Sequence, residues 1–110
     1  MSSITKDQVL KTLATEDLFR FCSQWKIQEL ALFGSALRKD FNEDSDLDLL
    51  VTFQPSADWS LLDHVKMEKD LESLLGREVD LVSRRAIERS ANWIRRKAIL
   101  DSAQTVYVAG

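Results

Sequence analysis

Two apolar runs separated by a polar segment constrain the fold of this chain more than any other feature. The first is Leu30-Ala31-Leu32-Phe33-Gly34-Ser35, and the second is Asp46-Leu47-Asp48-Leu49-Leu50-Val51. An apolar run that stops at Gly-Ser and is followed, after a loop, by an alternating run indicates two β-strands. We therefore expect strands over 27–33 and 47–53.

The second of these strands begins with two acidic residues at alternate positions. Because residues i and i+2 of a strand project from the same face, Asp46 and Asp48 are expected to point to one side of the sheet. Two adjacent carboxylates repel each other, and a fold keeps such a pair mainly where a cation offsets the repulsion. The pair therefore predicts a site for a divalent metal ion.

A third acidic residue interrupts a later β-type run, Val79-Asp80-Leu81-Val82, which predicts a strand over 79–83. If this strand lies beside the strand of Asp46 and Asp48, three carboxylates converge. Carboxylate oxygens suit Mg²⁺ or Mn²⁺, whereas zinc prefers Cys and His, of which the chain has only Cys22 and His64.

Gly34-Ser35 supplies a second half of the predicted site. A glycine at the end of a strand lets another group approach the backbone, and the amides and hydroxyl after it can bind phosphate oxygens. Phosphate donors beside a carboxylate cluster that holds two metal ions suit the transfer of a nucleotidyl group with loss of pyrophosphate.

These residues together resemble the signature of the DNA polymerase β-type nucleotidyltransferase superfamily, in which Gly-Ser, ten residues, Asp-x-Asp and a later strand Asp recur in this order. The Leu-Phe-Gly-Ser lead-in, the segment 76–82 and the ending Val106-Tyr107 resemble the minimal nucleotidyltransferase (MNT) antitoxins in particular. The resemblance runs from about residue 27 to the C-terminus.

This resemblance implies an α/β nucleotidyltransferase fold, in which a small mixed β-sheet is packed with helices. The family's catalytic and metal-binding carboxylates correspond to Asp46, Asp48 and Asp80. Its nucleotide-binding positions correspond to Gly34, Ser35 and Arg38. The resemblance also implies two Mg²⁺ ions, with Mn²⁺ as an alternative, and ATP as the substrate.

For the acceptor, the resemblance implies transfer of AMP to a tyrosine of a cognate HEPN-domain ribonuclease toxin, which the antitoxin neutralises within a hetero-oligomer. Two alternatives stay open. One is a non-catalytic antitoxin that covers the toxin. The other is a nucleotidyltransferase acting on a small molecule, as the aminoglycoside enzymes do, although these usually carry an additional acceptor-binding domain.

The length of 110 residues predicts a single domain over 1–110, with a helical N-terminal segment at about 5–25 and a catalytic core at about 27–110. The net charge of -3 disfavours direct binding of nucleic acid. A lone cysteine and the lack of a long apolar run favour a cytoplasmic protein that does not contact membranes.

The remaining elements are predicted to be helical, apart from a β-prone tail at 105–108 that is expected to pack against the body or a second subunit. A helix is expected over 58–75, with an apolar stripe and Gly76 as its left-handed cap. His64 is interpreted as a packed or surface residue. The helical segment 84–101 is the most basic part of the chain, and its cations are interpreted as solvated, or as partners of nucleotide phosphates or of an acidic protein surface.

Overall fold

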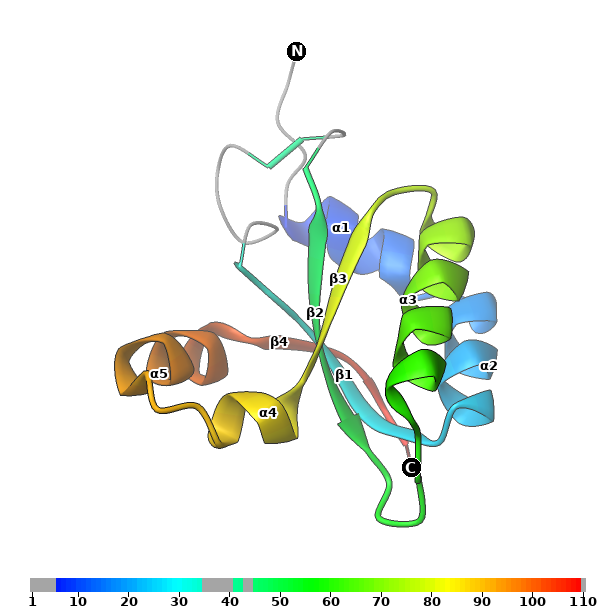
Figure 1. Ribbon diagram of the computed structural model, residues 1–110. Helices are drawn as coiled ribbons and strands as arrows, with labels where there is room; N and C mark the ends of the chain where they lie inside the picture. Colours follow the sequence, from blue (N-terminus) through cyan, green and yellow to red (C-terminus); the bar gives the residue numbers. More distant parts are fainter. Residues whose placement is uncertain (1–5, 35–40, 43–44, 110) are drawn as a thin grey trace.

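A four-stranded mixed β-sheet with helices on both faces forms the centre of the molecule (Figure 1). The computed structural model describes residues 6–34, 41–42 and 45–109. In chain order the elements are α1 (Lys6–Leu13), α2 (Glu16–Gln24), β1 (Ile27–Phe33), β2 (Leu47–Phe53), α3 (Leu61–Leu75), β3 (Val79–Ser83), α4 (Arg84–Glu88), α5 (Trp93–Ser102) and β4 (Gln104–Val108).

The strands lie in the order β3-β2-β1-β4. The central strand β1 pairs antiparallel with both β2 and β4, and β2 pairs parallel with β3. The helix α3 makes the crossover that a parallel pair requires. The mixed α/β sheet expected from the sequence is therefore confirmed, and the β-prone tail joins the same sheet as β4.

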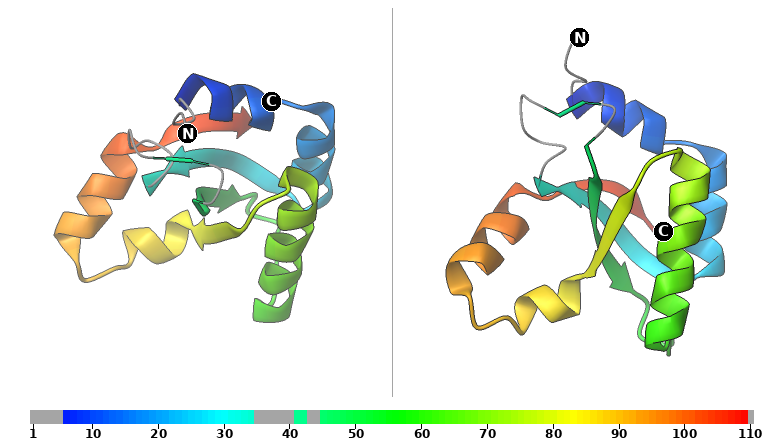
Figure 2. Two further views of the ribbon diagram at one scale, coloured as in Figure 1. Left: turned by 90° about the horizontal axis from the view of Figure 1, so that it is seen from above. Right: turned by 45° about the horizontal axis from the view of Figure 1, so that its top comes forward.

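The larger hydrophobic core lies on the face of the sheet covered by α1, α2 and α3 (Figure 2). Alternate residues of the strands point into it, among them Leu30 and Leu32 of β1 and Leu47 and Leu49 of β2. The N-terminal helices contribute Leu13 and other buried residues to the same cluster. The helical N-terminal segment and the sheet therefore form one packed unit.

A smaller core lies on the opposite face, where α4 and α5 cover the sheet. Its buried members are Ala31, Phe33, Leu50, Ile87 and Ile99. These strand residues are the ones that alternate with members of the larger core, as expected for a sheet buried on both faces.

Three helix boundaries differ from, or refine, the sequence expectation. The N-terminal segment forms two helices, and the Thr15 hydroxyl caps the second by accepting a hydrogen bond from Leu18 N at 3.3 Å. Helix α3 begins at Leu61 rather than at Asp58, because Ser60 and Asp63 form a capping box there. Gly76 ends it in the left-handed conformation, at φ 71°, as predicted.

The apolar stripe predicted for α3 is wrong in most of its members, which were Leu61, Leu62, Val65, Leu71, Leu74 and Leu75. Only Met67 and Leu71 are buried, whereas Leu61 and Leu62 are 80% and 81% exposed. The reason is that α3 turns polar side chains, not leucines, toward the neighbouring strand.

Three of these polar side chains lie one turn apart on α3 and bind the outer edge of β3. Glu72 Oε2 accepts a hydrogen bond from Val79 N at 3.1 Å, and Glu68 Oε2 accepts one from Leu81 N at 3.0 Å. His64 Nε2 lies 2.7 Å from Leu81 O, so the ring must carry its proton on Nε2. These contacts satisfy backbone groups that an edge strand otherwise leaves unpaired.

The segment expected to be helical over 84–101 forms two helices. Helix α4 ends at Glu88, and the Asn92 side chain caps α5 by accepting a hydrogen bond from Arg95 N at 3.1 Å. Ser90 Oγ in turn accepts one from Asn92 N at 3.2 Å. Polar side chains that bond to the backbone favour such breaks over a continuous helix. Across the described ranges, no helix is long and apolar enough to cross a membrane.

Candidate active site

Asp48 of β2 and Asp80 of β3 lie side by side at the start of two parallel strands. The two residues are direct partners in the register of β2 and β3, and paired strands are about 4.8 Å apart. Both alternate with buried leucines of the larger core, so both carboxylates point to the other face, on which α4 and α5 pack. The topology thus brings together two acids 32 positions apart in sequence.

Asp46 lies just before β2 and is exposed. Continuing the parallel register by one residue places it opposite Glu78, an acid that the sequence analysis did not single out. A hydrogen bond with the Asp46 side chain, together with the charges of Asp46 and Glu72, raises the pKa of the Glu78 carboxyl. The signal that could have revealed Glu78 is its i, i+2 spacing to Asp80, which matches that of Asp46 to Asp48.

The carboxylates create a region of strong negative potential. Partial burial raises the pKa of Asp80, and the charges of Asp48, Glu68 and Asp46 raise it further. Arg95 of α5 acts in the opposite direction and lowers the pKa of Asp80. Burial and the neighbouring carboxylates therefore disfavour the ionised form of Asp80, and a bound cation would favour it.

The donor chemistry of Asp48 and Asp80 fits a hard divalent cation such as Mg²⁺ or Mn²⁺, which prefers oxygen ligands. Neither softer ligand competes, since Cys22 is buried in the larger core and His64 is bonded to Leu81 O. In residues 6–34, 41–42 and 45–109, no three Asp, Glu, His or Cys side chains already converge closely enough to hold a metal ion.

Gly34 closes the other side of this cluster. It follows Phe33, the partner of Asp48 on β1, and adopts a positive φ of 67°. A Cβ at this position would overlap the Asp48 carboxylate and would lie 3.2 Å from its Cγ. Glycine is therefore required both by the backbone conformation and by the close approach of Asp48. The predicted phosphate-binding residues Ser35 and Arg38 lie outside the described residues.

The order of the strands gives the site a direction. Asp48 is on the middle strand β2, Asp80 is on β3 to one side, and Gly34 follows β1 on the other side. A group bound at Asp48 therefore has the Gly34 backbone on one flank and the Asp80 carboxylate on the opposite flank.

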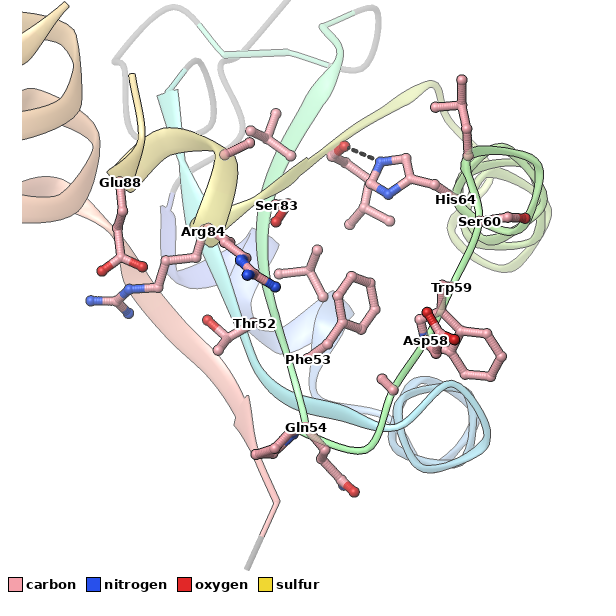
Figure 3. Close-up of a pocket in the computed structure, with 18 residues that line it drawn as sticks. Thr52, Phe53, Gln54, Asp58, Trp59, Ser60, His64, Ser83, Arg84 and Glu88 are labelled. Atoms are coloured by element: carbon pink, nitrogen blue, oxygen red, sulfur yellow. Dashed lines mark hydrogen bonds between the residues drawn. The ribbon is translucent and has the colours of Figure 1, made fainter. Parts of the chain in front are cut away.

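A hollow of about 850 Å³ lies elsewhere, at the far ends of the same strands (Figure 3). It lies between the end of β2, the start of α3 and α4, and its lining includes Phe53, Trp59, His64 and Arg84. None of the residues that line it is Gly34, Asp46, Asp48 or Asp80. This hollow is therefore separate from the carboxylate cluster.

Comparison with known proteins identifies similar sequences and structures. The family model of the nucleotidyltransferase domain matches residues 18–106. A protein of Thermococcus cleftensis named protein adenylyltransferase MntA is 33% identical over 88 residues, which are 80% of this chain and 86% of that protein.

Solved structures share the fold. One that is provisionally named a minimal nucleotidyltransferase has a TM-score of 0.65 and 34% identity, and the match covers 94% of this chain and 97% of that one. A chain in the complex of a tri-AMPylated HEPN toxin of Shewanella oneidensis with an MNT antitoxin has a TM-score of 0.61 and 21% identity, over 90% of this chain and 73% of that one. The second likeness concerns the fold alone.

Proposed function

Because this chain belongs to the nucleotidyltransferase domain family and is a nucleotidyltransferase, we propose that it transfers AMP from ATP to a tyrosine of a cognate HEPN-domain toxin and so neutralises that toxin. The family match and the similarity to MntA support the transfer of a nucleotidyl group. The single observation that carries the proposal within the molecule is the pairing of Asp48 with Asp80 beside Gly34.

In this proposal the carboxylates hold Mg²⁺ and the loop after β1 holds the nucleotide. Metal binding is assigned to Asp46, Asp48 and Asp80, and phosphate binding to Gly34, Ser35 and Arg38. When bound, the metal ions would draw charge from the phosphate oxygens and lower the pKa of the attacking hydroxyl. The carboxylate-only donor set and the uncompensated charge around Asp80 support this assignment.

The proposed reaction runs across the three strands. Gly34 and its loop hold the β- and γ-phosphates on the β1 side, and Asp80 faces the acceptor on the β3 side. The acceptor oxygen attacks the α-phosphorus, its proton passes to the Asp80 carboxylate, and the bond from the α-phosphorus to the bridging oxygen breaks. Pyrophosphate leaves on the side opposite to the attack, as an in-line displacement requires. The neighbouring charges that raise the pKa of Asp80 make it a better proton acceptor.

The test is to mix the purified protein with the HEPN-domain protein encoded beside its gene, ATP and Mg²⁺, and to measure the intact mass of that partner. We expect a gain of one or more AMP groups, located on tyrosine by peptide mass spectrometry. Omission of Mg²⁺ and the Asp48→Asn variant are the controls. An unmodified partner under these conditions contradicts the proposal.

A second candidate function is neutralisation by binding alone. It is favoured by one observation, namely that three metal-binding side chains do not converge in the part of the chain that the structure describes. The Asp46→Asn, Asp48→Asn double variant separates the two functions. Full protection of cells against the toxin by this variant would support masking, whereas loss of protection supports catalysis.

A further inference from the structure

The positive charge of this acidic protein is concentrated in α4 and α5. Six of the fifteen Lys and Arg residues lie between positions 84 and 97, and Glu88 is the one acid in that segment. The two helices project from the sheet on the side away from α1, α2 and α3 (Figures 1 and 2). They therefore form a basic arm, defined here as residues 84–102, on the face that carries Asp48 and Asp80.

Three cations of the basic arm already have partners. Arg84 forms an ion pair with Glu29 at 3.4 Å, and Lys97 forms one with Asp101 at 2.8 Å. Arg96 donates a hydrogen bond to Ser90 O at 3.0 Å, which ties α5 to the end of α4. These side chains therefore have structural roles within the arm or between the arm and β1.

Arg95 differs from them. Its guanidinium makes no hydrogen bond or ion pair with the residues that the structure describes, although its backbone N–H is bonded to the Asn92 cap. It lies one turn before Ile99, which is buried against the sheet together with Leu50. Leu50 is two residues after Asp48 on the same face of β2, so Ile99 anchors α5 next to the carboxylates and Arg95 lies on that side of the helix. Its charge reaches Asp80.

The start of α5 also exposes two large apolar side chains. Trp93 is 61% exposed and Ile94 is 64% exposed, directly before Arg95. Exposed Trp beside uncommitted Arg is the composition that protein interfaces favour at their centres. The start of α5 therefore exposes two apolar side chains for contact with a partner, directly before Arg95, whose charge acts on Asp80.

We propose that the basic arm is the docking surface for the protein acceptor, with Arg95 binding an acidic side chain near the modified tyrosine and Trp93 and Ile94 providing the apolar contact. This inference rests on the proposed function, in which Asp80 faces the acceptor. The charge of Arg95 acts on Asp80 of β3, whereas the Gly34 flank proposed for the β- and γ-phosphates lies on the other side of Asp48. An acceptor that reaches Asp80 must therefore approach the arm.

Charge favours an acidic protein over a nucleic acid as the occupant. The acidic residues outnumber the basic ones in the chain as a whole, with a net charge of -3, so a long polyanion would meet repulsion beyond the arm. A folded acceptor with a local acidic group meets only the arm and gains both the ionic and the apolar contacts.

The test compares Arg95→Gln, Trp93→Ala and the control Lys11→Gln, which removes the same charge from an exposed position of α1, outside the basic arm. We expect Arg95→Gln to raise the KM for the HEPN-domain acceptor about fivefold and Trp93→Ala to raise it about tenfold. The KM for ATP should stay within about twofold in both variants, and Lys11→Gln should change neither constant. Higher NaCl should raise the acceptor KM of the unmodified enzyme more than that of Arg95→Gln.

The dissociation constant of the enzyme–acceptor complex, measured by calorimetry without ATP, is expected to change by the same factors. This measurement separates the inference from the proposed function, because it needs no transfer. An unmodified enzyme that binds the acceptor but transfers no AMP would contradict the proposed function alone. Unchanged acceptor affinity in Arg95→Gln and Trp93→Ala would overturn the inference, as would an increase confined to the KM for ATP. Tighter binding of single-stranded RNA than of the acceptor would assign the arm to nucleic acid and also overturn it.

Discussion

At the scale of single residues, Gly34 is the position where backbone conformation and site geometry coincide. Gly34→Ala should destabilise the protein by about 1–2 kcal/mol, because its φ of 67° disfavours any side chain, and should abolish AMP transfer, because the added methyl displaces the Asp48 carboxylate. Urea unfolding and the transfer assay measure the two effects.

Gly76→Ala is the matched control for this variant. Gly76 has a similar φ of 71°, but no heavy atom lies within 4 Å of a Cβ built there. The Gly76→Ala variant should therefore lose about as much stability as Gly34→Ala and keep its transfer activity. Equal activity of Gly34→Ala and Gly76→Ala would contradict the requirement for close contact between residue 34 and Asp48.

Substitution of Asp48 tests the assignment of this residue as a metal ligand. Asp48→Asn should abolish transfer while leaving the protein at least as stable without metal, since one repulsion with Asp80 is removed. Adding Mg²⁺ should raise the Tm of the unmodified protein and leave that of the variant unchanged. Calorimetric scans with and without EDTA provide the measurement, and an equal Mg²⁺ response in both proteins would exclude Asp48 as a ligand.

Cys22 gives the protein a predictable sensitivity to alkali. Burial raises the pKa of its thiol from 9.0 to about 12, so the folded state holds the proton more tightly than the unfolded state. The protonated thiol contributes fully to the free energy of unfolding below pH 9. This contribution is lost as the pH rises toward 12, which lowers the free energy of unfolding by up to about 4 kcal/mol. Urea unfolding at a series of pH values should show this loss, and Cys22→Ala should lack that part of it. An identical alkaline slope in both proteins would contradict the assignment.

At the scale of secondary-structure elements, the contact between α3 and the edge of β3 is the least expected feature. Glu68→Ala leaves Leu81 N without an acceptor and should destabilise the protein by about 1–2 kcal/mol. Glu68→Gln retains an acceptor and relieves repulsion with Asp80, so its stability should be close to that of the unmodified protein. Asp70→Ala, on the exposed side of α3, is the control.

Hydrogen exchange of the Leu81 amide provides a second measurement of the same contact. It should become faster in Glu68→Ala and stay slow in Asp70→Ala. An unchanged exchange rate in Glu68→Ala would mean that the carboxylate does not protect this amide.

The strands β1, β2 and β3 could be predicted from the sequence with their correct bounds, because their apolar runs ended at residues such as Gly34 and Pro55. The β-prone tail was predicted at 105–108, and β4 begins one residue earlier, at Gln104. The exposure of the α3 leucines could not be predicted. Helical periodicity reports which residues share a face, whereas the choice of the face that meets the sheet depended on Glu68 and Glu72 finding backbone donors on a strand that follows them in the chain.

Glu78 was missed for a related reason. The residue gained importance from standing opposite Asp46 in a parallel pair, and strand pairing is not encoded in local pattern. The site residues Asp48 and Asp80 could be proposed without that knowledge, because their spacing and their apolar neighbours set them apart. The pairing of Asp48 with Asp80 in adjacent strands could be learned only from the structure.

At the scale of the whole molecule, the two faces of the sheet are held by cores of unequal size. Counted over the residues that the structure describes, the larger cluster has sixteen buried members, and the smaller one, which anchors α4 and α5, has five. We expect amides of α5 to exchange faster than those of α3 and β2 in native-state hydrogen exchange, because local opening of the arm exposes less apolar surface. Binding of the acceptor should slow exchange in α5 and leave α1 unchanged. Equal protection of α5 and α3 in the free protein would contradict this difference.

The contacts of His64, Glu68 and Glu72 with β3 also limit how copies of this protein can associate. A sheet grows from molecule to molecule only through strand borders whose amides and carbonyls are available, and on β3 the amides of Val79 and Leu81 and the carbonyl of Leu81 are already bonded to α3. Among the described elements, β4 forms the other border of the sheet. Continuous polymerisation into fibrils needs two available borders, so we expect native copies that pair through β4 to stop at two molecules.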